Sequence, residues 1–288
     1  MTIVVTGATG HLGQLAVQAL LDRGAAATDI VAAGRNVDAL ESLAERGVRT
    51  AVIDYTDPST LAAAFAGADK VLLISGTAAG QRTAQHGAAI NAAKSAGVGH
   101  LVYTSAPRAD DTPLVLAPEH AATEVLLRDS QLPFTILRNN WYTENYLDTA
   151  RQAAATGEVV GSAGAGRVAS ASRVDYAEAA AAVLIGDGHL GRTYELAGDT
   201  AWNFEEFAAA VSELAGRPVT YRPVTTEQHV AILRQAGLDD GTAEFVAALD
   251  ANIRDGALDS SSTDLRTLIG RPTTPLAEGL ASVFVPAA

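Results

Sequence analysis

Three glycines near the start of the chain have the types and spacing of a phosphate-binding turn. Gly7, Gly10 and Gly13 follow a short β-branched run, Ile3–Val5, and precede apolar side chains that recur at helical spacing up to Gly24. The pattern predicts a strand, a tight turn and a helix whose N-terminus faces an anion. The spacing departs from the G-x-G-x-x-G of many dehydrogenases. We expect the first two glycines to let the backbone approach a pyrophosphate and the third to let the helix press against the strand.

The next chemically informative residue is Arg35, directly after a second apolar run, Ile30–Gly34. A doubly wound fold places the residue that meets the adenosine ribose at this point. A carboxylate there favours a free 2′-hydroxyl, whereas a guanidinium suits a 2′-phosphate. The sequence therefore predicts NADP(H), with NADPH preferred over NADH; the alternative is a solvated loop arginine. Asp54, after the third apolar run, either approaches the adenine or caps the turn before Pro58.

Residues 139–146 form the densest cluster of aromatic and amide side chains in a chain that is only 5% aromatic. Such side chains could hold a planar ligand between aromatic faces and amide donors. The alternative is that Trp141, Tyr142 and Tyr146 belong to the core. Upstream, His120 and Glu124 share one face of an expected helix at i, i+4, so they either pair only with each other or take part in chemistry.

Composition excludes several classes of site and partner. The formal net charge of −13 and the pI near 4.8 argue against a nucleic-acid-binding surface. The absence of cysteine excludes disulfides, thiolate metal sites and thiol nucleophiles, and we predict no metal. No apolar run approaches the length of a membrane span, and the chain starts with a strand where a signal peptide would lie. We therefore expect a cytoplasmic protein, monomeric or homodimeric, with no membrane partner.

Short apolar runs and helical patterns alternate along the first half of the chain. Expected strands lie at 3–5, 30–34, 50–53, 71–76, 100–105 and 134–138, with helices between them. This alternation predicts an α/β fold, a Rossmann-like doubly wound parallel sheet covered by helices. We expect residues 1–150 to form the NAD(P)-binding part. Residues 151–288 should form a smaller, mostly helical substrate-side lobe, with chain segments that interleave into one compact unit.

Taken together, these segments resemble the atypical short-chain dehydrogenase/reductases of the NmrA-like group. Within that group the sequence is similar to the bacterial NAD(P)H:quinone oxidoreductases and the related triphenylmethane dye reductases. The resemblance covers nearly the whole chain. It rests on residues 7–13, 35–36, 73–75, 103–105, 119–124, 137–146, 169–176, 194–199 and 269–274.

The resemblance implies a cofactor site and a substrate site. The residues that it assigns to NADPH are Gly7, Thr9, Gly10, His11, Leu12, Gly13, Arg35, Ile74, Ser75, Gly76, Ser105, Asn139, Asn140, Trp141 and Arg173. Ser105 either binds the cofactor or takes part in catalysis, and Arg173 either faces a ligand or pairs with Asp175 or a helix end. The catalytic candidates are Tyr142, Asn145 and His120.

One departure from ordinary short-chain dehydrogenases is informative. Those enzymes use Tyr-x-x-x-Lys on a helix, but the matching positions here hold His120 and Glu124. A glutamate cannot lower the pKa of a tyrosine through positive charge. A quinone accepts a hydride readily and needs orientation and a few hydrogen-bond donors more than a strong general acid. We therefore expect direct hydride transfer from NADPH to a quinone near Trp141 and Tyr142, without flavin. Tyr142 or Asn145 would polarise its oxygen, and solvent or His120 would supply the proton.

Two other functions fit the same residues. The first is a non-catalytic regulatory protein that senses NAD(P), because NmrA-like proteins include such sensors and the loss of Tyr-x-x-x-Lys suits both. The second keeps the reductase chemistry but changes the acceptor to a dye, a nitro compound or another electrophile.

Overall fold

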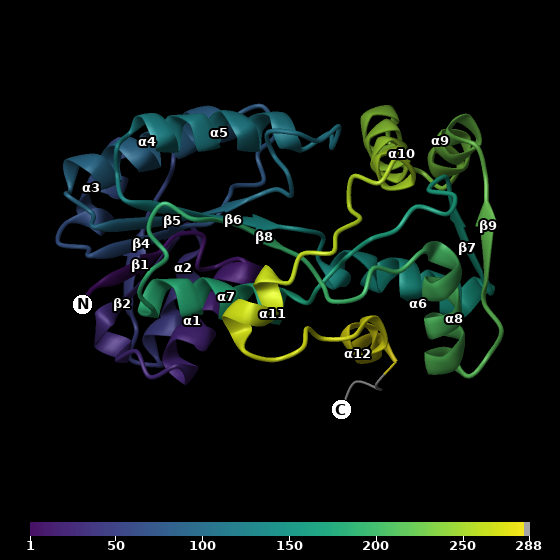
Figure 1. The fold of residues 1–288 in the computed structure, drawn as a ribbon, viewed down its shortest axis with the longest axis horizontal. Helices are drawn as coiled ribbons and strands as arrows, with labels where there is room; N and C mark the ends of the chain where they lie inside the picture. The colour runs from purple at the N-terminus through teal and green to yellow at the C-terminus, as the bar shows by residue number, and fades with distance from the viewer. Residues whose placement is uncertain (285–288) are drawn as a thin grey trace.

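A seven-stranded parallel sheet forms the centre of the protein in the computed structural model, which describes residues 1–284 (Figure 1). Its strand order is β3-β2-β1-β4-β5-β6-β8, so the order reverses between β1 and β4. The strands are β1 (Ile3–Val5), β2 (Ile30–Gly34), β3 (Arg49–Val52), β4 (Lys70–Leu73), β5 (His100–Ser105), β6 (Phe134–Asn139) and β8 (Thr193–Leu196). The predicted doubly wound fold is confirmed.

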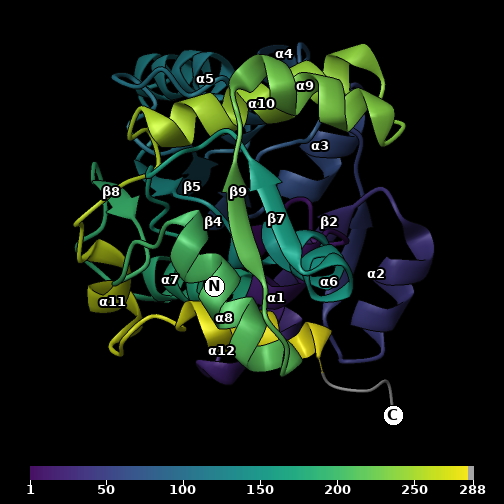
Figure 2. The same cartoon turned by 90° about the vertical axis from the view of Figure 1, so that its right-hand side faces the viewer.

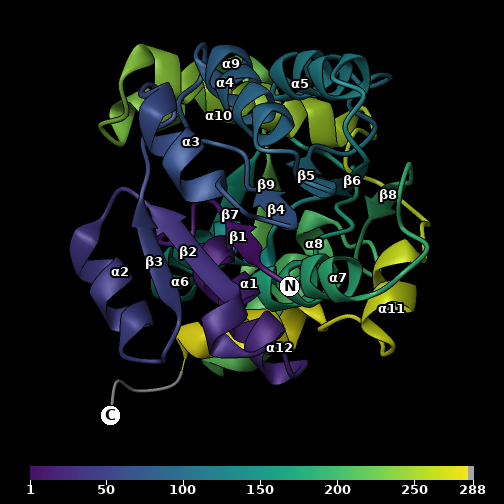
Figure 3. The same ribbon diagram turned by 90° about the vertical axis from the view of Figure 1, so that its left-hand side faces the viewer.

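Helices cover both faces of the sheet, which explains why the central strands β1, β2 and β4 are almost wholly apolar. On one face lie α3 (Pro58–Phe65), α4 (Arg82–Ser95) and α5 (Ala117–Asp129). On the other lie α1 (His11–Asp22), α2 (Val37–Ala44), α7 (Arg173–Ile185) and α11 (Asp264–Ile269). Figure 1 shows the sheet nearly edge-on between these layers, and Figure 3 views it from the side of β2 and β3.

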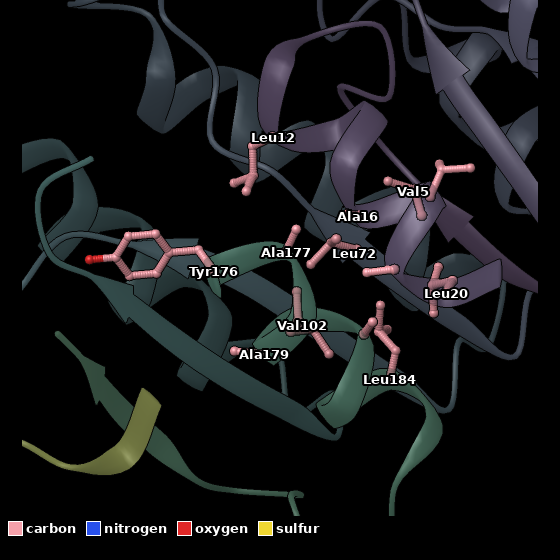
Figure 4. Close-up of a cluster of buried hydrophobic side chains, with 14 of the residues drawn as sticks. Val5, Leu12, Ala16, Leu20, Leu72, Val102, Tyr176, Ala177, Ala179 and Leu184 are labelled. Atoms are coloured by element: carbon pink, nitrogen blue, oxygen red, sulfur yellow. The ribbon is translucent and has the colours of Figure 1, made fainter. Parts of the chain in front are cut away.

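Neighbouring residues of β1 pack into two different cores, one on each face of the sheet. Val4 packs with the α3–α5 layer, whereas Val5 packs with α1 and α7, because successive side chains point to opposite faces. The second core brings Leu20 of α1 against Leu184 of α7, as Figure 4 shows. A segment from late in the chain thus supports the helix that follows the glycine turn.

A second lobe lies beyond the carboxyl ends of the strands (Figure 2). It has a two-stranded parallel sheet of β7 (Glu158–Gly161) and β9 (Thr220–Pro223). Around it lie α6 (Leu147–Thr156), α8 (Phe204–Ala215), α9 (Thr226–Gln235), α10 (Asp240–Arg254) and α12 (Leu276–Leu280). An aromatic core of Tyr146, Trp202, Phe204 and Phe207 joins α6 to α8, with ring centroids 4.9–6.0 Å apart. The alternative that Tyr146 is a core residue is confirmed.

Several element boundaries differ from those expected. β4 ends at Leu73, so residues 74–76 form a loop and not the end of a strand. The glycine-rich stretch 157–166 contains β7, which is not among the expected strands. The division at residue 150 stays a proposal: α7, β8 and α11, which come after it, pack with the N-terminal half. Within residues 1–284, no helix combines the length and the apolar character that a membrane crossing needs.

Candidate functional site

A cleft of about 670 Å³ runs along the carboxyl ends of the strands, across the point where the strand order reverses. Open α/β sheets place their ligand sites there. Every site residue predicted from the sequence lines this cleft. These residues lie at or after the ends of β1, β2, β4, β5 and β6, or in α1, α5 and α7. The structure also adds lining residues that the sequence patterns did not indicate, namely Tyr55, Arg82, Gln85, Leu114 and Leu116. No group of three or more acidic or histidine side chains within residues 1–284 has a metal-binding arrangement.

The glycine turn occupies the middle of the cleft. Gly7 has a φ of +60°, a backbone conformation that residues with a side chain rarely adopt, and this lets the chain reverse after β1. A Cβ on Gly13 would lie 2.2 Å from the Gly7 carbonyl oxygen, so only glycine lets α1 start this close to the turn. Gly10 caps α1 without a side-chain hydrogen bond, and no acid lies in the first turn. The first amides of α1 are therefore free to bind an anion.

Arg35 marks one end of the cleft, next to this turn. Its side chain is exposed, and no carboxylate among the described residues pairs with it. Its neighbour Asn36 caps α2 by accepting a hydrogen bond from the Ala39 amide at 3.1 Å. A Cβ on Gly34 would lie 2.7 Å from Thr9, so the turn packs directly on the end of β2. Arg35 is thus a free cation held beside the turn amides.

Two side chains at this end connect strand ends. The half-buried Tyr55 side chain donates its hydroxyl to Thr6 Oγ1 at 2.7 Å, and the hydroxyl lies 3.2 Å from the Ile74 carbonyl oxygen. Burial raises the pKa of Tyr55 to about 12, so it stays a neutral phenol. Asp54 accepts hydrogen bonds from the amide and hydroxyl of Thr56, which lower its pKa. It caps its turn, as one of the two interpretations expects, and it also lines the cleft.

The loop 74–76 is fixed along its backbone. The Ser75 amide donates to Thr104 Oγ1 at 2.9 Å, and the Gly76 amide donates to His86 Nε2 at 3.1 Å. Arg82 Nε donates to the Gly76 carbonyl at 2.7 Å. His86 is a buried packing residue, and burial lowers its pKa to about 4, which keeps Nε2 free to accept. The loop is therefore rigid although it lies outside the strand.

The aromatic and amide cluster lies at the other end of the cleft. Asn139 Nδ2 donates to the Tyr142 hydroxyl at 3.3 Å, while Asn139 Oδ1 is buried without a partner among residues 1–284. Arg173 lies over the Tyr142 ring, 4.9 Å from its centroid, and donates to Asn145 Oδ1 at 2.9 Å. Burial raises the pKa of Tyr142. Tyr142 therefore keeps its proton and can donate it in a hydrogen bond, as can the Asn145 amide.

Arg173 and Asp175 do not pair, which excludes that interpretation of Arg173. Arg173 instead lies 3.9 Å from Glu144, and its amide donates to the same carboxylate at 2.8 Å. Asp175 completes the N-terminal capping box of α7 with Ser172 and binds Arg271 at 2.8 Å.

A buried ion-pair network lies behind Ser105. Glu124 is only 1% exposed and accepts two hydrogen bonds from Arg138, at 2.9 and 2.7 Å, and one from Ser105 Oγ at 2.7 Å. Burial alone would raise the pKa of Glu124, but Arg138 and Ser105 together lower it. The Ser105 proton is thus committed to Glu124, and Ser105 offers the cleft an acceptor oxygen.

The expected pair of His120 with Glu124 is wrong. His120 Nδ1 lies 2.9 Å from the Tyr103 hydroxyl, whereas Glu124 points toward β6, where Arg138 holds it. The i, i+4 spacing correctly predicts that both residues lie on one helix face. It could not show that each forms its hydrogen bond with a residue of a neighbouring strand. Tyr103 and Arg138 lie within apolar strand patterns, so the sequence offered no sign of these roles.

Comparisons with known proteins agree with this geometry. A model of the NAD(P)H-binding family matches residues 7–186. The chain is 45% identical over 282 residues to quinone oxidoreductase 2 of Escherichia coli, covering 98% of each chain. It is 31% identical to an NAD(P)H azoreductase of Xenophilus azovorans, covering 96% of each.

Solved structures extend the likeness to the whole fold. The E. coli NADPH-dependent quinone oxidoreductase complexed with NADPH superposes with a TM-score of 0.95 at 44% identity, covering 99% of this chain and 100% of that one. The Citrobacter triphenylmethane reductase complexed with NADP(H) gives a TM-score of 0.93 at 39% identity, covering 98% and 100%. The resemblance drawn from the motifs is confirmed, and the chain belongs to the NAD(P)H-binding family.

Proposed function

We propose that this protein is an NADPH-dependent reductase that transfers a hydride directly to a quinone or a similarly electrophilic acceptor. The observation that carries the proposal is the single cleft, which joins an anion-binding turn and a free arginine at one end to neutral hydrogen-bond donors and aromatic rings at the other. The relationship to a quinone oxidoreductase over nearly the whole chain supports the same reaction.

The residues present fit NADPH. The Gly13 position leaves room only for backbone beside the pyrophosphate, and Arg35 would bind a 2′-phosphate. Asn139 Oδ1 is a buried acceptor that has no protein partner among the described residues, and such atoms are costly unless a ligand satisfies them. A carboxamide N–H at this end of the cleft would satisfy it.

When bound, NADPH supplies a hydride, which carries the two electrons of the reduction. The protein has to orient the acceptor and stabilise the negative charge that develops on its oxygen. Trp141 and Tyr142 offer flat faces for the ring, and Tyr142, Asn145 and His120 offer neutral donors. Because the product oxyanion is a delocalised phenolate, a few fixed donors suffice. One proton must then be added to give the hydroquinone.

We infer that this proton comes from solvent. Burial and the nearby charge of Arg82 lower the pKa of His120 to about 4, so at neutral pH the imidazole carries no proton to release. His120 can donate a hydrogen bond but is not an acid there. The cleft opens to water beside the exposed Asn145, which gives the oxyanion a route to protonation.

Flavin has no role in this scheme, since hydride donor and acceptor would share one cleft. The test is NADPH oxidation by purified protein without flavin, confirmed by its absorption spectrum, against a panel of quinones with NADH in parallel. NADPH-selective turnover is the expected result. Tight NADP(H) binding with no turnover of any acceptor would instead favour the sensor.

The acceptor class is a second question for the same assay. The triphenylmethane reductase and azoreductase relatives favour including a cationic dye and an azo compound in the panel. A higher kcat/KM for either one than for every quinone would move the proposal to that acceptor. The cytoplasmic location, the monomeric or homodimeric state and the lack of a nucleic-acid partner remain predictions.

A further inference from the structure

The imidazole of His120 is held from behind by a residue outside the cleft. The hydroxyl of Tyr103, on β5, lies 2.9 Å from His120 Nδ1. Tyr103 is fully buried and does not line the cleft, whereas His120 does. Whatever Tyr103 contributes to the reaction must therefore pass through His120.

The direction of this hydrogen bond follows from its surroundings. Burial raises the pKa of Tyr103 well above its ordinary value, so the phenol keeps its proton and needs an acceptor. The nearby Thr123 hydroxyl already donates to the Glu119 carbonyl at 2.8 Å and lies 3.0 Å from His86 Nδ1. Since His86 Nε2 accepts from Gly76, His86 donates to Thr123 from Nδ1. Among residues 1–284, His120 Nδ1 is the only group that forms a hydrogen bond with the Tyr103 hydroxyl by distance and angle, so the phenol donates to an unprotonated Nδ1.

A neutral imidazole that accepts at Nδ1 carries its proton on Nε2. No protein group among residues 1–284 forms a hydrogen bond with His120 Nε2, and the ring lines the cleft. The charge of Arg82 beside the ring disfavours a second proton, and Arg82 is itself held by the Gly76 carbonyl and, at 3.6 Å, by Glu119. The geometry thus leaves one neutral N–H without a protein partner among the described residues, on a ring that lines the cleft.

We propose that Tyr103 is a positioning residue that fixes His120 as the Nε2–H tautomer and so aims a neutral hydrogen-bond donor at the acceptor oxygen. The kinetic part of this inference rests on the proposed function, but the tautomer does not. The principle is that a donor prearranged toward developing charge needs no reorganisation during the reaction.

The tautomer is tested by long-range ¹H–¹⁵N NMR on the full-length protein labelled at its six histidines. His120→Gln identifies the His120 signals by their loss. The expected wild-type spectrum shows a protonated Nε2 and an unprotonated Nδ1 at His120 at pH 7. A protonated Nδ1 would overturn the proposal, and the wild-type spectrum decides this whether or not any variant folds.

The kinetic test compares Tyr103→Phe with a matched control, Tyr221→Phe, which removes a hydroxyl that donates to the Gly161 carbonyl in the second lobe. Tyr103→Phe should lower kcat with a quinone about tenfold while leaving the KM for NADPH unchanged, because one oriented hydrogen bond is lost outside the cofactor site. Tyr221→Phe should leave both the His120 signals and kcat unchanged.

A double-mutant cycle separates positioning from a structural effect. The His120→Gln amide supplies an N–H at the position of Nε2 but has no tautomers to choose between. In that background Tyr103→Phe should change kcat less than twofold, whereas an equal tenfold fall in both backgrounds would contradict the inference. Absence of turnover by the wild type with every quinone would defeat the proposed function alone, since the spectra would still decide the tautomer.

Discussion

Arg35 is the residue on which the choice between the two nicotinamide dinucleotides depends, because its exposed guanidinium pairs with no described carboxylate. We predict that Arg35→Ala raises the KM for NADPH about 10- to 100-fold, the loss expected for one charge-assisted contact, and leaves the KM for NADH nearly unchanged. Arg49→Ala, an exposed arginine on β3 that does not line the cleft, is the control. Equal losses with both dinucleotides would remove Arg35 from the 2′-phosphate.

Glu124 provides a residue-scale prediction about stability. Glu124→Gln should lower the free energy of unfolding by about 3 kcal/mol, because the buried Arg138 then loses its bidentate partner. Urea unfolding measures this, and the exposed Glu244→Gln, which breaks a surface pair with Arg234, should cost less than about 1 kcal/mol. Since the pKa of Glu124 is lowered on folding, its contribution is present above about pH 4.5 and is lost as the pH falls further. The free energy of unfolding of Glu124→Gln should therefore fall less below pH 4.5 than that of the wild type.

At this scale the sequence identified the residues better than their partners. All the predicted site residues line the cleft, and most of them directly follow a strand end, because parallel strands bring their carboxyl ends to one edge. His120 in α5 and Arg173 at the start of α7 are exceptions. Arg138 and Tyr103 were not foreseen, because their pairing with Glu124 and His120 depends on how α5 lies against β5 and β6. Spacing within one helix carries no such information.

At the scale of elements, the turn between β1 and α1 depends on close contact. A Cβ on Gly13 would lie 2.2 Å from the Gly7 oxygen, whereas one on Gly10 would lie 3.4 Å from the same atom. We predict that Gly13→Ala lowers stability by about 1–3 kcal/mol and abolishes NADPH binding, because the turn must move away from the helix. Gly10→Ala should leave the stability nearly unchanged. Urea unfolding and NADPH fluorescence titration check the two effects, and tight NADPH binding by Gly13→Ala would contradict this account.

The sequence predicted elements well where a local pattern set both ends. Ile3–Val5, Ile30–Gly34 and His100–Ser105 have the expected bounds. The end of β4 was misplaced because Ile74 continues the apolar run, although its amide bonds to the Thr6 side chain and not to a strand. β7 was missed because its pairing partner, β9, lies about 60 residues later in the chain.

At the scale of the whole molecule, buried histidines should set the response to acid. His86, His100 and His120 are buried, and burial is the main cause that lowers the pKa of each to about 4. In the unfolded chain these histidines bind protons near pH 6.5, whereas in the folded chain they stay unprotonated down to about pH 4. The contribution of these histidines to the free energy of unfolding is therefore fully present above pH 6.5 and falls as the pH drops from 6.5 toward 4.

Each histidine should contribute a slope of up to about 1.4 kcal/mol per pH unit in that window. Urea unfolding of the protein without cofactor, between pH 7 and pH 5, measures the total. His100→Asn should make the curve shallower, even if the variant is less stable at every pH, and the exposed His11→Asn is the control. A flat curve would mean that these imidazoles are protonated in the folded protein.

The path of the chain between the lobes also determines what happens when it is cut. After the second lobe begins with α6, the chain returns to the first half for α7 and β8, leaves again for α8 to α10, and returns for α11. A single peptide-bond cleavage in the exposed β9–α9 connection would therefore leave both fragments with strands or helices in each core. The nicked protein should stay assembled under native conditions and separate only on denaturation. Because neither lobe is built from one continuous stretch of chain, neither could be exchanged between relatives by one crossover in the gene.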